Sequence, residues 1–165
     1  SAIRTGNLIL LMSVGFIIGC PLWGTLSDRI FKTRKGLIVF CLLITGVIFL
    51  VLNTLSHKTG LIVVTPIFFA FGLTASGGML MYSHIKDLMP QEMAGAAMTG
   101  INFFNMLGPA VFLQGLGVLM QHLYPEASRG PAAFDAAFLL CMVCLAGSAL
   151  LYLFTAGKQL NRKNT

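Results

Sequence analysis

Two amides and a proline lie close together in an otherwise apolar stretch, where they could bind a solute. Asn102 and Asn105 are three residues apart, so they share one face of a helix. Pro109 has no N–H and leaves the carbonyl of Asn105 without its usual helical donor. A polar face beside a kink is what a solute path through hydrocarbon needs. The same amides could instead join neighbouring helices, and the sequence does not separate the two roles.

A second group of residues could form ion pairs. Residues 24–35 include Asp28 and Arg29 and end in the basic pair Arg34 and Lys35. An anion at the end of one helix can face the positive N-terminus of another, and the two arginines can pair with Asp28 or with anionic lipid. Such contacts would latch two parts of a protein together. Alternatively, the basic residues only determine how the chain is oriented.

Other reactive side chains carry weaker signals. Cys141 and Cys144 form a C-x-x-C pair, but no second pair and no nearby His accompany them, so we interpret them as packed free thiols. His84 could titrate near neutral pH, but it lies beside Lys86 at an expected membrane interface. The motifs H-E-x-x-H, G-x-S-x-G and G-x-x-x-x-G-K-[ST] are absent. We therefore predict that the chain is not an enzyme and holds no metal or other cofactor.

The elements that position these residues are predicted to be membrane-spanning helices. Of the 165 residues, 56% are hydrophobic and 10% charged, whereas soluble domains carry roughly a quarter charged residues. Five stretches without Asp, Glu, Lys or Arg are each as long as the roughly 20 residues that cross the hydrocarbon. We predict an all-α integral membrane protein, a single bundle of five transmembrane helices. The spans are expected at about residues 6–27, 36–56, 60–85, 94–123 and 134–156, with a tail at 157–165.

The basic residues predict the orientation of the bundle. Eight of the eleven fall on one side, namely Arg29, Lys32, Arg34, Lys35, Lys86, Lys158, Arg162 and Lys163. The other side has Arg4, Lys58 and Arg129. Because cytoplasmic connectors retain Lys and Arg, we predict a multi-pass protein of the cytoplasmic (plasma) membrane with its N-terminus outside and its C-terminus in the cytoplasm. Topology thus explains the net charge of +6, and nucleic acid is not expected as a partner.

Small residues in the first and third spans predict close helix contacts. Gly15 and Gly19 are four residues apart, and Gly77 and Gly78 lie in a run of small residues. Small residues let two helices approach closely in lipid. We therefore expect these four glycines at helix–helix interfaces.

Two motifs resemble the major facilitator superfamily. Residues 24–35 resemble its cytoplasmic signature, G-x-L-[SA]-D-R-x-G-R-[RK], with matches at Gly24, Leu26, Ser27, Asp28, Arg29, Arg34 and Lys35. Phe31 stands where the second glycine of the signature is usual, and the basic end is longer, which looks more like the copy in the second half of the family's fold. Further on, Pro90, Gly95 and Gly100 resemble the family's entry into its fifth or eleventh helix.

The resemblance implies that the chain is part of a larger fold. The five spans then match helices 8 to 12, in the C-terminal half, and helices 2 to 6 are the alternative. Both assignments lack one helix of their own half and all of the other half, and the sequence has no initiator Met. We therefore expect a fragment whose partners are the lipid bilayer and the missing helices of the same transporter.

The resemblance also implies a function. It predicts part of a secondary active transporter that moves a small solute, either alone or with a coupling ion, by alternating access with a rocker-switch motion. The solute would lie between the halves near the bilayer midplane, and the residues of the signature would latch the cytoplasmic side. No Asp or Glu is expected inside a span, so an ion-coupling carboxylate would lie outside this chain. The alternative is a membrane sensor or assembly subunit that keeps the fold without transport.

Overall fold

The chain forms helices and turns over the residues that the structure describes. The computed structural model describes residues 2–31, 33–55, 60–123 and 131–155. Its elements are α1 (Ala2–Leu26), the π-helical turn η1 (Ser27–Phe31), α2 (Arg34–Thr54), α3 (Leu61–Ala75), the 3-10 turn η2 (Ser76–Met79), α4 (Leu80–Leu88), α5 (Gln91–Leu123) and α6 (Pro131–Leu153). Among these residues, five helical segments are long and apolar enough to cross a membrane, the third being α3, η2 and α4 together. The prediction of an all-α bundle of five spans is thereby confirmed.

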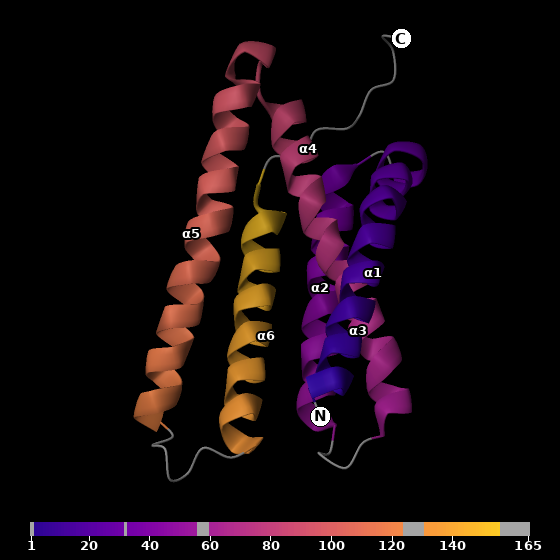
Figure 1. The fold of residues 1–165 in the computed structure, drawn as a ribbon. Helices are drawn as coiled ribbons and strands as arrows, with labels where there is room; N and C mark the ends of the chain where they lie inside the picture. Colours follow the sequence, from indigo (N-terminus) through magenta and orange to yellow (C-terminus); the bar gives the residue numbers. More distant parts are fainter. Residues whose placement is uncertain (1, 32, 56–59, 124–130, 156–165) are drawn as a thin grey trace.

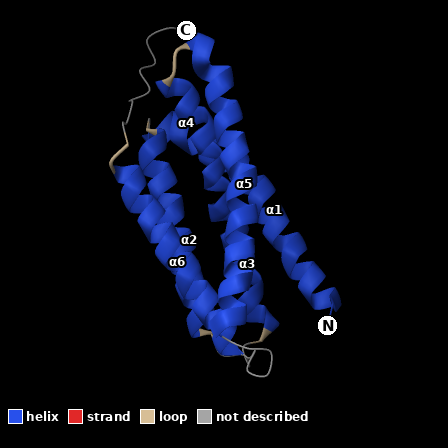
Figure 2. Cartoon of the chain, turned by 90° about the vertical axis from the view of Figure 1, so that its left-hand side faces the viewer, coloured by secondary structure: helices blue, strands red, loops and turns tan. Residues whose placement is uncertain are grey.

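The helices run along one long axis, and the chain turns alternately at two ends (Figures 1 and 2). One end holds η1, the start of α2, the α4–α5 connection and the end of α6. Arg29, Arg34, Lys35 and Lys86 gather there, and we call it the basic end. Of the other residues used in the charge argument, only Arg4 is described, and the predicted tail at 157–165 also lies outside the described residues. Which end faces the cytoplasm stays a prediction.

Glycines bring α1 and α3 into backbone contact. An added Cβ at Gly15 or Gly19 would overlap the backbone of α3, and one at Gly72 would overlap the backbone of Met12 in α1. Two helices in lipid can approach this closely only where one or both lack side chains. The α1–α3 pair is therefore held by direct packing of main chain on main chain.

The third span, expected as one helix over 60–85, is interrupted by η2. The carbonyl of Leu73, just before the break, accepts hydrogen bonds from Nε1 of Trp23 in α1 (2.6 Å) and from Oγ of Ser76 (2.7 Å). Where a helix tightens to 3-10 pairing, nearby carbonyls need other donors, above all in apolar surroundings. On the other side of the break, Gly77 lies against the side chain of Cys41 in α2. Both neighbouring helices thus support the interruption.

The four glycines expected at helix contacts have different surroundings. Gly15, Gly19 and Gly77 lie against other elements. A Cβ at Gly78 would meet no described atom within 4 Å, and Gly78 lines a hollow instead. The 3-10 geometry of η2 explains this, because successive residues in it point roughly 120° apart.

The buried core lies between α1, α2 and α4. It consists of Trp23, Leu37, Ile38, Cys41 and Leu80. Beside it, two buried threonines join α2 to α3 through a hydrogen bond of 3.1 Å from Oγ1 of Thr45 to Oγ1 of Thr74. The oxygen of each hydroxyl also lies within hydrogen-bond distance of a carbonyl in its own helix, so both polar side chains have partners although they are buried.

Helices α2 and α6 are joined near both of their ends. At the basic end, Nζ of Lys35 donates to the carbonyls of Leu153 (2.7 Å) and Thr155 (2.6 Å). Near the opposite end, Nδ2 of Asn53 donates to the carbonyl of Asp135 (2.9 Å). The last carbonyls of a helix lack intrahelical partners and attract a cation, so Lys35 caps α6.

Carboxylates lie closer to the spans than the sequence indicated. Asp28 is in η1, Asp87 in α4, Glu92 in the first turn of α5 and Asp135 in α6. The helices extend beyond the uncharged stretches, so the expectation that no Asp or Glu lies inside a span is wrong at the span ends. Asp135 already falls within the predicted span at 134–156. The middles of the spans remain free of acidic residues.

The contact between α1 and α3 predicts opposite effects for two Gly→Ala changes in the intact transporter. Gly72→Ala forces apart two backbones, and overpacking of this kind costs about 1–3 kcal/mol. Gly46→Ala in α2 adds a Cβ to open space and should leave stability unchanged or raise it, since Ala favours a helix over Gly. The measurement is the thermal unfolding midpoint of the purified protein in detergent. Equal midpoints for the two variants would contradict the close contact.

Candidate functional site

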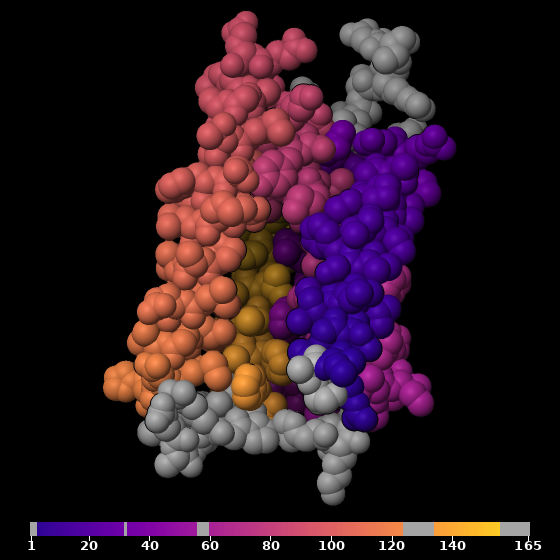
Figure 3. Space-filling model, viewed as in Figure 1, coloured from indigo at the N-terminus to yellow at the C-terminus, as the bar shows by residue number. Residues whose placement is uncertain are grey.

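A hollow lies between α1 and α5, with α6 visible behind it (Figure 3). Its upper part, toward the basic end, is a cavity of about 790 Å³. The lining residues come from five elements: Phe16, Ala75, Gly78, Met79, Met81, Tyr82, Ile85, Ala97, Gly100, Ile101, Phe104 and Asn105. This size and this mostly apolar lining are typical of small-molecule sites.

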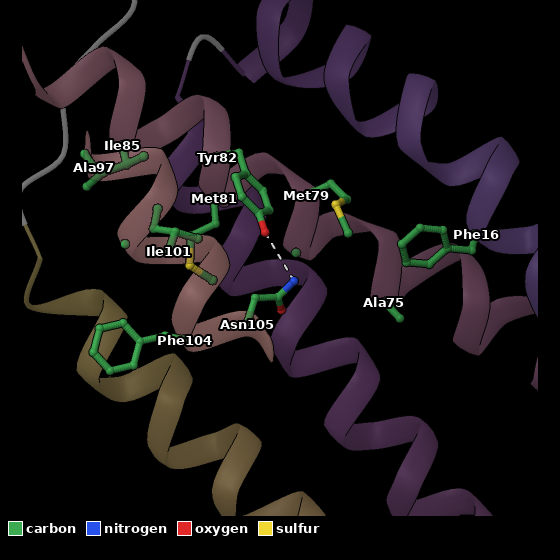
Figure 4. A pocket seen from close by; sticks show the side chains of 12 residues that line it. Phe16, Ala75, Met79, Met81, Tyr82, Ile85, Ala97, Ile101, Phe104 and Asn105 are labelled. Carbon is green, nitrogen blue, oxygen red and sulfur yellow. Dashed lines mark hydrogen bonds between the residues drawn. The ribbon is translucent and has the colours of Figure 1, made fainter. Parts of the chain in front are cut away.

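Three polar side chains form a hydrogen-bonded group at this hollow. The hydroxyl of Tyr82 in α4 donates to Oδ1 of Asn102 (3.3 Å) and accepts from Nδ2 of Asn105 (3.2 Å). Both asparagines lie in α5, so the group joins α4 to α5 beside the hollow. Figure 4 shows its bond between Tyr82 and Asn105. We call Tyr82, Asn102 and Asn105 the amide group.

The amide group combines both roles that the sequence left open. Its hydrogen bonds join α4 to α5, yet Tyr82 and Asn105 also line the cavity. Tyr82 was not among the predicted site residues, although it is a polar aromatic residue in an apolar span. Pro109 lies one turn beyond Asn105 inside a continuous α5 and is not among the cavity-lining residues.

Arg34 forms ion pairs with two carboxylates at the basic end. Its Nη2 lies 3.3 Å from Oδ1 of Asp28, and its Nε lies 2.5 Å from Oδ2 of Asp87. The side chain of Arg34 is 16% exposed, that of Asp87 28% and that of Asp28 56%. The shorter and less exposed pair is therefore the one with Asp87. We call these three residues the Arg34 cluster; it joins η1, the start of α2 and the end of α4.

The other residues expected in the signature lie apart from the Arg34 cluster. Lys35 caps α6, as described above. Arg29 is exposed and has no ion pair with a described residue, and a Cβ at Gly24 would meet no described atom within 4 Å. Asp87 was missed by sequence reasoning because its partner lies 53 positions earlier, beyond the reach of any local motif. Among the described residues, no three His, Cys, Asp or Glu side chains gather in a way that could hold a metal ion.

The five long apolar helical segments indicate a multi-pass membrane protein. The chain belongs to the Major Facilitator Superfamily, whose sequence profile matches residues 1–165. It is also similar to the "Uncharacterized transporter YwbF" of Bacillus subtilis (strain 168), with 33% identity over 119 residues. The matched part is 70% of this chain and 29% of that protein, so the chain spans less than a third of this curated relative. No solved structure matches the chain significantly.

Family membership confirms the resemblance that residues 24–35 and 90–100 indicated. It also supports the prediction that the chain is not an enzyme, because proteins of this family are generally transporters. The assignment of the five helical segments to helices 8 to 12 stays a prediction.

The Arg34 cluster predicts unequal effects for two carboxylate substitutions in the intact transporter. Asp87→Asn removes the closer, less exposed partner of Arg34 and should lower stability by about 1–3 kcal/mol, as expected when a mostly buried polar group loses its nearer partner. Asp28→Asn removes an exposed partner and should cost less than about 1 kcal/mol. Both variants should still insert in the membrane. Thermal unfolding and membrane yield test this, and a greater loss in Asp28→Asn would show that the ranking is wrong.

Proposed function

We propose that this chain forms most of one half of a secondary transporter, which moves a small solute across the membrane by alternating access. The observation that carries the proposal is the amide group at the wall of a cavity between α1, α4 and α5. Polar side chains at membrane depth are costly and are retained where they bind substrate or line a path. The family match and the relative named as a transporter support the same function.

The Arg34 cluster would act as a latch at the basic end. It joins the end of the third span to the connector between the first two spans, so its ion pairs resist separation of these elements. Asp28, which is half exposed, remains accessible to a partner from the other half of the transporter. A rocker-switch motion would break and remake such contacts. On this proposal Asp28→Asn and Asp87→Asn both slow transport.

We also propose an assignment and an orientation within the full transporter. The five helical segments correspond to helices 8 to 12, with helices 2 to 6 as the alternative. The basic end faces the cytoplasm, since four described basic residues gather there and cytoplasmic connectors retain Lys and Arg. The remaining helices of the protein would complete the cavity, and a coupling ion, if one is used, would bind to them or to the carboxylates at the span ends.

Cysteine labelling tests whether the cavity is on the solute path. In the intact transporter without its native cysteines, Asn102→Cys and Asn105→Cys should react with a small, water-soluble methanethiosulfonate reagent. Saturating solute should slow the reaction at residue 105 at least several-fold. Gln114→Cys is a matched control, because nine residues of α-helix place it on the opposite face of α5, about 180° from residue 105.

Two outcomes would contradict the proposal. If the cysteines at 102 and 105 are unreactive in every state, the amide group only packs helices together. If solute slows labelling at position 114 as much as at position 105, the solute changes accessibility throughout α5, and the protection does not place the solute in the cavity.

A further inference from the structure

The cavity wall that this chain contributes is apolar apart from one hydrogen-bonding edge. In Figure 4 the bond between Tyr82 and Asn105 lies between two phenyl rings, those of Phe16 and Phe104. Methionine, alanine and isoleucine side chains and two glycines, Gly78 and Gly100, make up the rest of the wall. Aromatic and thioether groups pack well against the apolar part of a solute.

The hydrogen bonds within the amide group determine which of its polar atoms remains available to a solute. The single hydroxyl hydrogen of Tyr82 is given to Asn102, so the atom of Asn105 that faces this hydroxyl must be its donor, Nδ2. The carboxamide of Asn105 is thereby oriented, and its Oδ1 accepts no hydrogen bond from a described residue. A carbonyl oxygen in apolar surroundings is costly without a donor. Oδ1 of Asn105 is therefore the acceptor that the wall presents to a solute.

Charged side chains of the described residues do not line this wall, although Lys86 and Asp87 directly follow its lining residue Ile85. The Arg34 cluster and Lys35 are at the basic end, and Asp135 is near the opposite end of the bundle. The cavity lining includes no charged residue among the described ones. An ionised solute placed against this wall would lose hydration and gain no opposite charge from it.

We infer that the transported solute is uncharged and amphipathic. An O–H or N–H group of the solute donates to Oδ1 of Asn105, and its apolar part lies against Phe16 and Phe104. Tyr82 acts as a positioning residue, because it turns Nδ2 of Asn105 away from the solute and Oδ1 toward it. This inference rests on the proposed function, since it identifies the cavity with the solute path.

Matched solutes test the inference on the purified intact transporter. The probes are trios of the same size that differ in charge: benzamide, benzoate and benzamidine, and glucose, glucuronate and glucosamine. Thermal unfolding is followed at increasing concentration of each probe. An uncharged member should raise the unfolding midpoint at lower concentration than its ionised counterparts.

Three variants link this binding to the amide group. Asn105→Ala should weaken binding of the uncharged probe roughly 2- to 10-fold, as expected for one hydrogen bond. Tyr82→Phe should weaken binding less, because the ring stays and only the hydrogen bond that orients Asn105 is lost. This variant also provides the test if Asn105→Ala does not fold. Gln114→Ala, on the opposite face of α5, should bind as the unaltered protein does.

The inference is overturned if an ionised probe binds more tightly than its uncharged counterpart, if no uncharged probe binds, or if Asn105→Ala and Tyr82→Phe both leave binding unchanged. Uptake of the bound probe into proteoliposomes is measured as well, because it distinguishes an error in the inferred solute class from an error in the proposed transport function. Asn105-dependent uptake of an ionised solute keeps the transport proposal and rejects the solute class. Asn105-dependent binding of an uncharged solute without uptake rejects the transport proposal and keeps the inference that the cavity binds uncharged solutes.

Discussion

The interruption of the third span depends on one hydrogen-bonding requirement. A backbone carbonyl in hydrocarbon must have a donor, and at Leu73 the indole of Trp23 and the hydroxyl of Ser76 supply it. The glycines of α1 and α3 allow the two backbones to come close enough for Trp23 to reach this carbonyl. The break, the core around Trp23 and the α1–α3 contact are therefore parts of one arrangement.

The interruption also positions both polar clusters. Before it, α3 packs along α1; after it, α4 lies beside α5, so the third span crosses the bundle from one side to the other (Figure 1). Tyr82 thereby reaches the asparagines of α5, and Asp87 reaches Arg34 at the start of α2. A straight helix over the same residues would present these two side chains in other directions. The proposed solute site and the proposed latch thus share one element, α4.

The sequence predicts the spans and local faces well because each depends on nearby residues. Uncharged stretches indicate membrane helices, and the three-residue spacing of Asn102 and Asn105 places both on one face. The break at η2, the partner of Arg34 and the role of Lys35 depend on contacts between segments far apart in the chain, which no local pattern contains. The end of the third span was misjudged for a related reason: Asp87 can lie inside a helix because α2 supplies a partner, Arg34, to its carboxylate.

The two connections between α2 and α6 restrict how these helices can move. Lys35 joins them at one end and Asn53 at the other, across an interface that also contains the rings of Phe49 and Phe138, 5.9 Å apart. Two antiparallel rods joined at a single point can pivot or slide, whereas rods joined near both ends can only turn together. Helices α2 and α6 would therefore move together as one rigid body. Any movement of helices relative to one another within this chain would then involve α4 and α5, and α5 has few buried residues.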